Sequence, residues 1–526
     1  MDLTYNSKKE SNSLVGNDFI RVLIALAFIL GCGFYASANG MAASNLSILA
    51  IAAAIGAYMA VNIGANDVAN NVGPAVGSKA LSMTGAILIA AIFEAAGALI
   101  AGGTVVGTIK KGIINPNAIA DAETFIWVMM AALLAGAIWL NLATYLGAPV
   151  STTHSIVGGV LGAGIAAGGW DIANWDKMTA IVASWVISPV LGGVIAATFL
   201  IYIKRAVTYK SDMIEAARKT VPLLVGIMVW AFSTYLILKG LKKIWKLDIV
   251  AAGLIGFAIA LTVYFLVRPM VDKAASSLKN DKDAVNSLFT IPLIVSAALL
   301  SFAHGANDVA NAIGPLAAIN DALISGAVSG KAAIPLWVML IGGVGIAVGL
   351  ALFGPKLIRT VGSEITELDK MRAFCVAMAA AITVIIASQL GLPVSSTHIA
   401  VGGIFGVGFL REYLKLSYNK KLAAITAHSE EAGHDAEQTQ AFVERFNAAD
   451  VTEKRAILRE LKASKLASPI SSAERKGLKK ATKKELVKRS ALLKIAAAWV
   501  ITVPASAILA GLIFYMLLGF SVTHAS

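Results

Sequence analysis

Apolar runs long enough to cross a lipid bilayer recur along the chain from residue 22 to residue 518. A membrane-spanning helix needs about 20 such residues, and in lipid a helix satisfies its own backbone hydrogen bonds. We therefore predict an all-α polytopic membrane protein with about 12 or 13 membrane segments. The segments are expected near 22–38, 46–63, 83–103, 124–146, 155–167, 177–203, 222–238, 249–267, 289–304, 333–354, 372–390, 398–410 and 495–518.

The distribution of charge supports this fold class. Charged residues make up only 14% of the chain, against roughly 25% in soluble proteins, which excludes a water-soluble surface. The net charge of +13 does not indicate nucleic-acid binding, because the basic residues gather in loops between the apolar runs. Loops rich in Lys and Arg between membrane spans are retained on the cytoplasmic side. We therefore place the loops 204–219, 268–282 and 411–494 and the N-terminus inside and the C-terminus outside, with the basic loop 239–246 as an exception.

Two motifs occur twice, in the same order and at nearly the same period. Residues 64–74 read GANDVANNVGP and residues 305–315 read GANDVANAIGP, while residues 147–154 read GAPVSTTH and residues 391–398 read GLPVSSTH. The chain therefore contains a duplication. An odd number of predicted spans separates the two units, so they should enter the membrane from opposite sides, as in secondary transporters built from inverted repeats with broken helices and helical hairpins.

The duplication suggests a division of the chain into six parts. These are an N-terminal tail with an extra first span (1–45), a first inverted repeat (46–220), connecting spans and a loop (221–288), a second inverted repeat (289–410), a basic cytoplasmic loop (411–494), and a last span with an outer tail (495–526).

Two acidic residues, Asp67 and Asp308, are predicted at membrane depth, where a carboxylate costs roughly 2.5 to 3.5 kcal/mol. Each lies beside two asparagines four residues apart, which share one face of a helix. Carboxylate and amide oxygens suit Na⁺ or a proton, and hydrogen bonding between helices is the alternative. The amides belong to Asn66, Asn70, Asn307 and Asn311. Glu94 is a third acid predicted within the membrane, without a matching acid in the second half, and for it a coupling role and an interhelical hydrogen bond both stay open.

Hydroxyl clusters follow the proline of each second motif. The first turn of the helix that begins there has free N–H groups and partial positive charge, which favours an anion. Ordinary N-capping is the alternative. The hydroxyls belong to Ser151, Thr152, Thr153, Ser395, Ser396 and Thr397. The histidines that follow, His154 and His398, are candidates for proton relay or for structural hydrogen-bond donors.

These charges predict coupled binding. At 5 Å and an effective dielectric of about 20, an ionised carboxylate repels an anion by roughly 3 kcal/mol per unit pair. No Arg or Lys lies inside either motif pair. Cations or protons must therefore neutralise Asp67 and Asp308 before an anion can enter, and that dependence is symport.

The two motifs resemble the signature of the inorganic phosphate transporter (PiT) family, a duplicated GANDVAN with a PVS[ST]TH hairpin in each half; the resemblance covers about 46–410. It implies symport of inorganic phosphate with Na⁺ or H⁺ and no enzyme activity. It implies phosphate binding by Ser151, Thr152, Thr153, Ser395, Ser396, Thr397, Asp67 and Asp308. It implies cation binding or coupling by Asn66, Asp67, Asn70, Asn307, Asp308, Asn311 and Glu94, with sodium at the Asn/Asp clusters. Unlike many members, this chain carries its long loop after the second hairpin.

The expected function is therefore secondary active transport of phosphate, with Na⁺ favoured over H⁺ because several neutral oxygens lie beside each carboxylate. The expected partners are phosphate, Na⁺ or H⁺ and the lipid bilayer, without nucleic acid or a cofactor, and a homodimer is left open. A bacterial inner membrane is the expected location. Sulfate or metal-phosphate permeation by the same architecture is the alternative. A remote one is an intramembrane hydrolase that uses Asp67 with Asp308, or Ser151 with His154.

Overall fold

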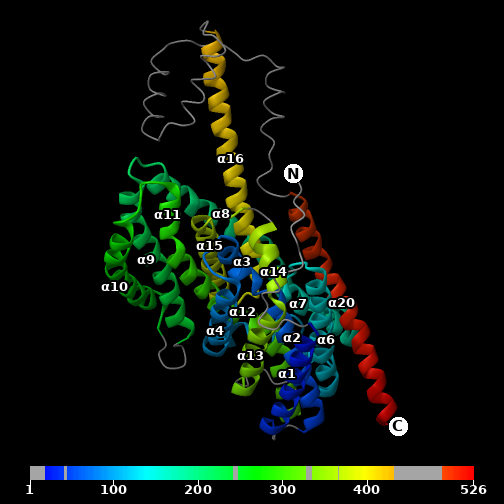
Figure 1. Cartoon of the computed structure of the whole chain (residues 1–526). Helices are drawn as coiled ribbons and strands as arrows, with labels where there is room; N and C mark the ends of the chain where they lie inside the picture. Colours follow the sequence, from blue (N-terminus) through cyan, green and yellow to red (C-terminus); the bar gives the residue numbers. More distant parts are fainter. Residues whose placement is uncertain are drawn as a thin grey trace.

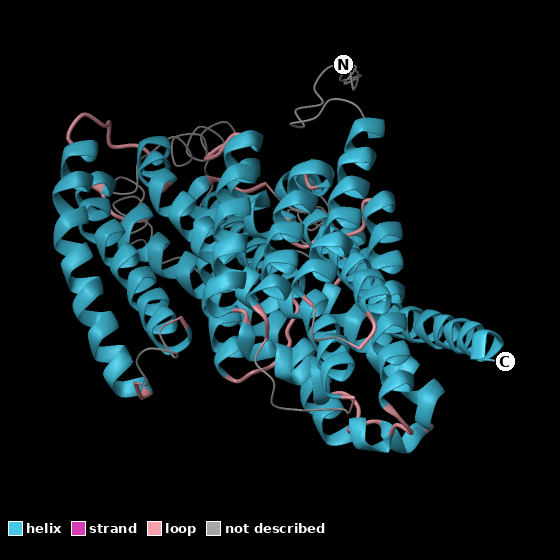
Figure 2. Cartoon of the chain, turned by 90° about the horizontal axis from the view of Figure 1, so that it is seen from below, coloured by secondary structure: helices cyan, strands magenta, loops and turns pink. Residues whose placement is uncertain are grey.

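The computed structural model describes residues 18–40, 44–240, 247–326, 334–364, 367–431 and 489–525. This part of the chain is helical and contains no β-strand (Figure 1, Figure 2). The longer helices are α1 (Asp18–Asn39), α2 (Leu46–Asn66), α4 (Met83–Ala101), α6 (Ala122–Leu146), α7 (Thr152–Gly168), α8 (Trp175–Ile203), α9 (Met213–Lys239), α10 (Ile249–Ala275), α12 (Thr290–Ser325), α13 (Leu336–Phe353), α15 (Lys370–Gln389), α16 (Ser396–Glu431) and α20 (Arg489–Ala525). Shorter helices are α3 (Ala69–Gly77), α5 (Gly103–Lys111), α11 (Lys282–Leu288) and α14 (Pro355–Arg359), with π-helical turns at Lys204–Thr208 and Thr360–Glu364.

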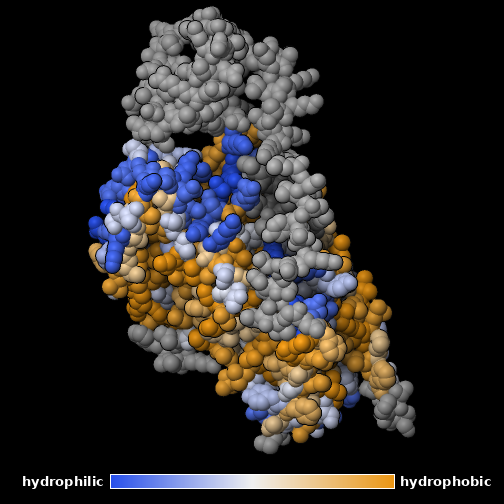
Figure 3. Space-filling model, viewed as in Figure 1, coloured by the Kyte–Doolittle hydropathy of each residue, from blue (hydrophilic) through white to orange (hydrophobic). Residues whose placement is uncertain are grey.

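The prediction of a polytopic helical membrane protein is confirmed. Within the described residues, eleven helices are long and apolar enough to cross a membrane. The two short predicted segments, 155–167 and 398–410, fall on α7 and on the first part of α16, which are not among these eleven. On the face seen in Figure 3, apolar residues form a broad belt, and hydrophilic residues gather at the end where α11 lies. The predicted orientation of the termini is not tested and stays a prediction.

The two copies of the acidic motif do not have the same backbone. In the first copy the helix is interrupted, because α2 ends at Asn66 and α3 begins at Ala69. The second copy lies inside α12, which runs without a break through Asp308. At the interruption Asn70 Nδ2 donates to the carbonyl oxygen of Asp67 at 2.9 Å as well as to Thr397 of the second hairpin, whereas the equivalent Asn311 donates to hydroxyls of the first hairpin.

Helices of the two halves cross at glycines, and the crossings come in matching pairs. Helix α13 packs on α2, and α4 packs on α12. A Cβ atom on Gly64 would lie 1.9 Å from the carbonyl oxygen of Ile346, and one on Gly305 would lie 2.2 Å from that of Glu94. Only glycine permits such close approach of two backbones. The crossing of α4 with α12 is therefore equivalent to the crossing of α13 with α2.

The hairpin helices are packed in a second matched pair. Helix α20 packs on α7 of the first hairpin, and α8 packs on α16 of the second. A Cβ on Gly158 would lie 2.7 Å from the carbonyl oxygen of Val503, and one on Gly402 would lie 2.3 Å from that of Pro189. Helix α20 thus occupies the place in one half that α8 occupies in the other. These contacts agree with a duplication, while the opposite insertion of the halves stays a prediction.

Several helices surround this duplicated core. Helix α1, the extra first span, packs on α2 and α13, and α9 packs on α10. Helices α9 to α11 lie at one side of the molecule and α20 at the other (Figure 1). Helix α16 continues past its predicted end at 410 as far as Glu431 and projects beyond the helical body. The rest of the predicted basic loop, from 432 to 488, lies outside the described residues.

Candidate functional site

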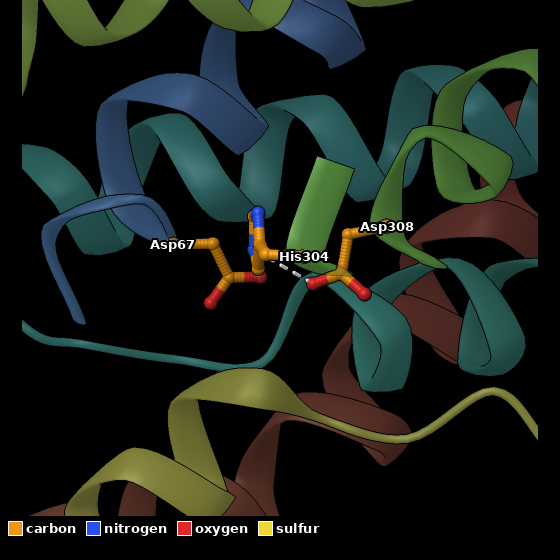
Figure 4. A group of neighbouring side chains, drawn as sticks. All are labelled: Asp67, His304 and Asp308. Atoms are coloured by element: carbon orange, nitrogen blue, oxygen red, sulfur yellow. Dashed lines mark ion pairs between the residues drawn. The ribbon is translucent and has the colours of Figure 1, made fainter. Parts of the chain in front are cut away.

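The two acidic motifs meet in the interior of the protein, around a histidine. His304, on α12, lies with its Nε2 atom 2.9 Å from Asp308 Oδ2 and 4.0 Å from Asp67 Oδ2. Figure 4 shows the imidazole ring between the two carboxylates. Ligand atoms of the three side chains lie within 4.8 Å of one another, and all three residues are at most 1% exposed. The predicted convergence of the two acids is therefore found in the structure.

The hydroxyl clusters open α7 and α16, as the sequence predicts. Ser151 precedes α7, and its Oγ atom accepts a hydrogen bond from the backbone N–H of His154 at 3.1 Å. Ser395 does the same for His398 at 3.2 Å at the start of α16. Both serines are buried N-caps, so their side chains already stabilise the helix starts that would face an anion.

The hydroxyls that follow these caps contact the carboxylates. Thr152 Oγ1 donates to Asp67 Oδ2 at 2.5 Å, and the equivalent Ser396 Oγ donates to Asp308 Oδ2 at 2.9 Å. Thr397, from the second hairpin, also donates to Asp67. Asp67 therefore accepts hydroxyl hydrogen bonds from both hairpins, which joins the two halves at one carboxylate.

Two asparagines make reciprocal contacts between the halves. Asn70 Nδ2 donates to Thr397 Oγ1 at 2.8 Å, from the first acidic motif to the second hairpin. Asn311 Nδ2 donates to Thr152 and Thr153 at 3.1 and 3.2 Å, from the second acidic motif to the first hairpin. The acidic motif of each half thus orients the hydroxyls of the other.

The other two asparagines hold the hairpins in place. Asn66 Nδ2 donates to Thr144 Oγ1 at 3.0 Å and to a carbonyl of the α6–α7 turn, and its Oδ1 accepts from the N–H of Val150 at 3.1 Å. Asn307 Nδ2 donates to Ser388 Oγ at 2.9 Å, on the helix before the second hairpin. The contacts of Asn66 and Asn307 are therefore those of the alternative given above, in which the asparagines form hydrogen bonds between helices.

Three buried oxygens in the same region have no hydrogen-bond donor. They are Asn70 Oδ1, Asn71 Oδ1 and Asp308 Oδ1. Buried polar atoms in native proteins almost always have a partner. Carboxylate and amide oxygens are the ligands that hard cations prefer. The chemistry of this cluster therefore fits a bound cation.

Glu94 is buried beside the site, in contact with the histidine that the sequence analysis did not identify. Its Oε2 atom lies 2.7 Å from His304 Nδ1, and its Oε1 atom accepts from Asn71 Nδ2 at 2.8 Å. The structure thus links Glu94 to Asp308 through His304 but gives it no contact with the hairpin hydroxyls. His304 is four residues before Asp308, the spacing that places two side chains on one helix face, and this spacing was the available signal.

The hairpin histidines form a buried aromatic stack. The rings of His154 and His398 meet edge to face with their centres 4.4 Å apart. His154 lies tilted against Trp185 at 3.8 Å, and His398 stacks on Trp499 at 3.7 Å. The backbone of Trp499 lies beside His154 and that of Trp185 beside His398, but no ring nitrogen of either histidine has acceptable hydrogen-bond geometry. Both histidines are therefore held within this aromatic cluster, and their role as structural donors or in proton relay stays a prediction.

A cavity approaches the first hairpin from the side of α1. Its volume is about 620 Å³, and it is bounded by α1, α2, α6 and α14. Its wall contains Arg21, which pairs with Asp18 at 2.9 Å, and Lys356, whose Nζ atom donates to the carbonyl oxygen of Tyr145 at 2.7 Å. Thr144, which Asn66 binds, also lines the cavity. The extra first span thus forms one wall of a space that extends to the hairpin turn.

Comparison with known proteins gives concordant results. A protein of Helicobacter pylori strain J99, named as a phosphate permease, is 53% identical over 517 residues, which are 97% of each chain. One of Pyrococcus abyssi with the same kind of name is 40% identical and covers 68% of this chain and 87% of its own. A solved structure titled "The sodium-dependent phosphate transporter" is 32% identical, has a TM-score of 0.72, and covers 90% of this chain and 99% of that one. The profile of the Phosphate transporter family matches residues 63–510. The chain therefore belongs to the phosphate transporter family.

Proposed function

We propose that the protein is a symporter that carries inorganic phosphate together with Na⁺ across a bacterial inner membrane. Membership in a transporter family excludes the hydrolase alternative. The observation that carries the proposal is the meeting of Asp67 and Asp308 beneath the hydroxyls of both hairpins. Similarity to a structure named as a sodium-dependent phosphate transporter supports both the solute and the ion.

The charges of the site explain why the two solutes bind together. Asp67, Asp308 and Glu94 are three buried acids around one histidine, and no Lys or Arg lies in the repeated motifs. At 5 Å and an effective dielectric of about 20, each ionised carboxylate would repel a unit negative charge by about 3 kcal/mol. Bound Na⁺ offsets this repulsion. Phosphate therefore binds well only after the cation.

The hydroxyl contacts supply a second link between cation and anion. Thr152 and Thr397 donate to Asp67, and Ser396 donates to Asp308. A cation held by these carboxylates competes for the same oxygen lone pairs. The hydroxyls are then free to donate to a phosphate at the first turns of α7 and α16, where the helix N-termini favour an anion.

The proposed ligands follow from these contacts. We assign the cation to oxygens of Asp67, Asp308 and Asn70. The other three asparagines, Asn66, Asn307 and Asn311, support this site by holding the hairpins and their hydroxyls in position. We assign phosphate to the hydroxyls of Ser151, Thr152, Thr153, Ser395, Ser396 and Thr397, adjacent to the two carboxylates. Glu94 acts through His304 in coupling.

The transport assay that tests the proposal separates the two driving ions. The purified chain is reconstituted in liposomes, and uptake of labelled phosphate is measured with a Na⁺ gradient alone, a proton gradient alone, and neither. We expect the Na⁺ gradient to drive accumulation and an excess of unlabelled sulfate to leave it unchanged. Uptake that responds to neither gradient would rule out symport, and strong competition by sulfate would rule out phosphate as the specific solute.

Substitution of the acids tests the site itself. Asp67→Asn and Asp308→Asn keep the size of the side chain and remove its charge, so each should abolish Na⁺-driven uptake while the protein still inserts. Glu123→Gln, at an exposed acid in the first turn of α6, is the matched control and should transport normally. Full coupled activity in either aspartate variant would overturn the assignment.

A further inference from the structure

A second cavity lies far from the acidic site, where the end of α8 meets the starts of α11 and α15. Its volume is about 110 Å³. Lys204 of the π-helical turn after α8, Lys282 of α11 and Arg372 of α15 all line it, and Asp369 is the one acid among its lining residues. Three cations around a small space with one carboxylate make a positively charged pocket.

The positive charge of this pocket is only partly compensated. Arg372 Nε lies 3.4 Å from Asp369 Oδ2, so the one acid is already paired. Lys204 forms no ion pair with any described residue, although its Nζ atom lies 5.6 Å from the ring centre of Tyr209. Three cations, Lys282, Arg372 and Arg411, and the one acid, Asp369, all lie near enough to act on its charge. Three like charges around a single carboxylate still repel one another, so this arrangement favours binding of an anion.

The polar groups of the pocket suit an oxyanion. Thr208 Oγ1 is buried in the lining without a hydrogen-bond partner and can donate. Arg372 presents a planar set of N–H donors, and the two lysines add ammonium donors, the groups that bind phosphate oxygens in proteins. The remaining lining residues include Leu200 and Met213, so the pocket joins polar and apolar surface.

The pocket lies at one end of a helix that is long and apolar enough to span a membrane, the level at which lipid headgroups are found. Lys204 and Thr208 lie in the last turns of a membrane-spanning segment, Trp175–Thr208. Hydrophilic residues gather at this end of the molecule, next to the apolar belt (Figure 3). Basic pockets between helices at the cytoplasmic side of a membrane bind anionic lipid headgroups.

We propose that Lys204, Lys282 and Arg372, with the hydroxyl of Thr208, form a second anion site that binds a phosphate group, either the headgroup of an anionic phospholipid or free inorganic phosphate. A ligand there joins the α8–α9 turn to α11 and α15. Since α8 packs on α16, and α15 precedes the second hairpin, the ligand stabilises the support of that hairpin. The proposal does not depend on which ion drives transport.

The test measures binding to the full-length chain in a non-ionic detergent, with choline in place of sodium. One arm titrates phosphatidylglycerol against phosphatidylcholine and counts retained lipids by native mass spectrometry. The other arm titrates inorganic phosphate and follows the thermal unfolding temperature. We expect Lys204→Gln/Lys282→Gln to weaken the binding of phosphatidylglycerol at least tenfold relative to the unchanged chain.

Matched variants keep the result decisive. Lys219→Gln removes a lysine that is 74% exposed and paired with Glu215, and it should bind like the unchanged chain. Lys282→Arg keeps the positive charge at an exposed position and should also retain binding. The single variants keep the test valid if the double variant Lys204→Gln/Lys282→Gln fails to fold. Loss of the lipid response alone identifies a headgroup site, and loss of both responses identifies a site for any phosphate group. If Lys282→Gln and Lys204→Gln each leave both responses unchanged, the proposal is wrong.

Discussion

Replacing His304 with isoleucine should destabilise the protein strongly, and adding Glu94→Ile to that variant should recover much of the loss. The matched crossings of the two halves provide the reason. Gly64 packs on the backbone of Ile346 as Gly305 packs on that of Glu94. Counting back along each motif, Ile63 takes the place of His304. One half thus has an acid and a histidine where the other half has two isoleucines, and the double variant copies the apolar pair.

The magnitude follows from the geometry of the pair. His304 is fully buried, with its ring nitrogens 2.7 Å from Glu94 and 2.9 Å from Asp308. Removal of one partner of a buried ion pair costs about 3–5 kcal/mol, whereas an apolar replacement of the whole pair is often nearly neutral. His304→Ile leaves two carboxylates unpaired, and the double variant leaves one. We therefore expect a coupling energy of about 2 kcal/mol between the two positions, within the range found for contacting residues.

The assay is a double-mutant cycle on the purified full-length chain. The free energy of unfolding is measured by denaturant titration in non-ionic micelles for the unchanged chain, His304→Ile, Glu94→Ile and the double variant. The pair His304→Ile with Glu123→Gln is the control and should be additive, because Glu123 lies in the exposed first turn of α6. Additivity within about 0.5 kcal/mol for the His304 and Glu94 pair would refute the reasoning.

Three further changes have expected outcomes in the same unfolding assay. Asn66→Ala removes three hydrogen bonds to the hairpin turn and Asn307→Ala removes one, so the first should cost more by about 1–2 kcal/mol; equal losses would contradict the hairpin-holding role. Gly305→Ala places a Cβ atom 2.2 Å from a backbone oxygen of α4 and should cost about 1–3 kcal/mol, whereas Gly253→Ala meets open space and should be tolerated. His154→Phe keeps the stack and removes two unpartnered nitrogens, so stability should be unchanged or higher, and a clear loss would reveal a missing polar partner.

The membrane-spanning helices could be predicted from the sequence because hydropathy and length determine them almost alone. The convergence of acids and hydroxyls was also predictable, since a motif that occurs twice implies two related half-sites. Asp67 and Asp308 meet near the hydroxyls of Thr152 and Ser396. In such cases the local pattern is enough, because the same residues make equivalent contacts in both halves.

Contacts that depend on how the halves pack could not be predicted in this way. Asn70 and Asn311 follow the same six residues, GANDVA, yet Asn70 also donates to a carbonyl oxygen in its own motif, where the helix is interrupted, while Asn311 lies in a continuous helix. His304 precedes its motif and has an isoleucine as its counterpart, so a search for repeated polar residues passes over it. Its role is defined by Glu94, which is 210 residues away along the chain.

The residues that break the repeat are connected to one another. Asn71 donates to Glu94, Glu94 contacts His304, and His304 contacts Asp308. In the second half the position of Asn71 holds an alanine, and the acid and the histidine are replaced by isoleucines. A site made only of matched groups would respond to its ligands equally in both halves. This polar chain gives the α4–α12 crossing alone a contact that depends on the charge at Asp308, so we expect cation binding to alter that crossing and to leave the α2–α13 crossing unchanged.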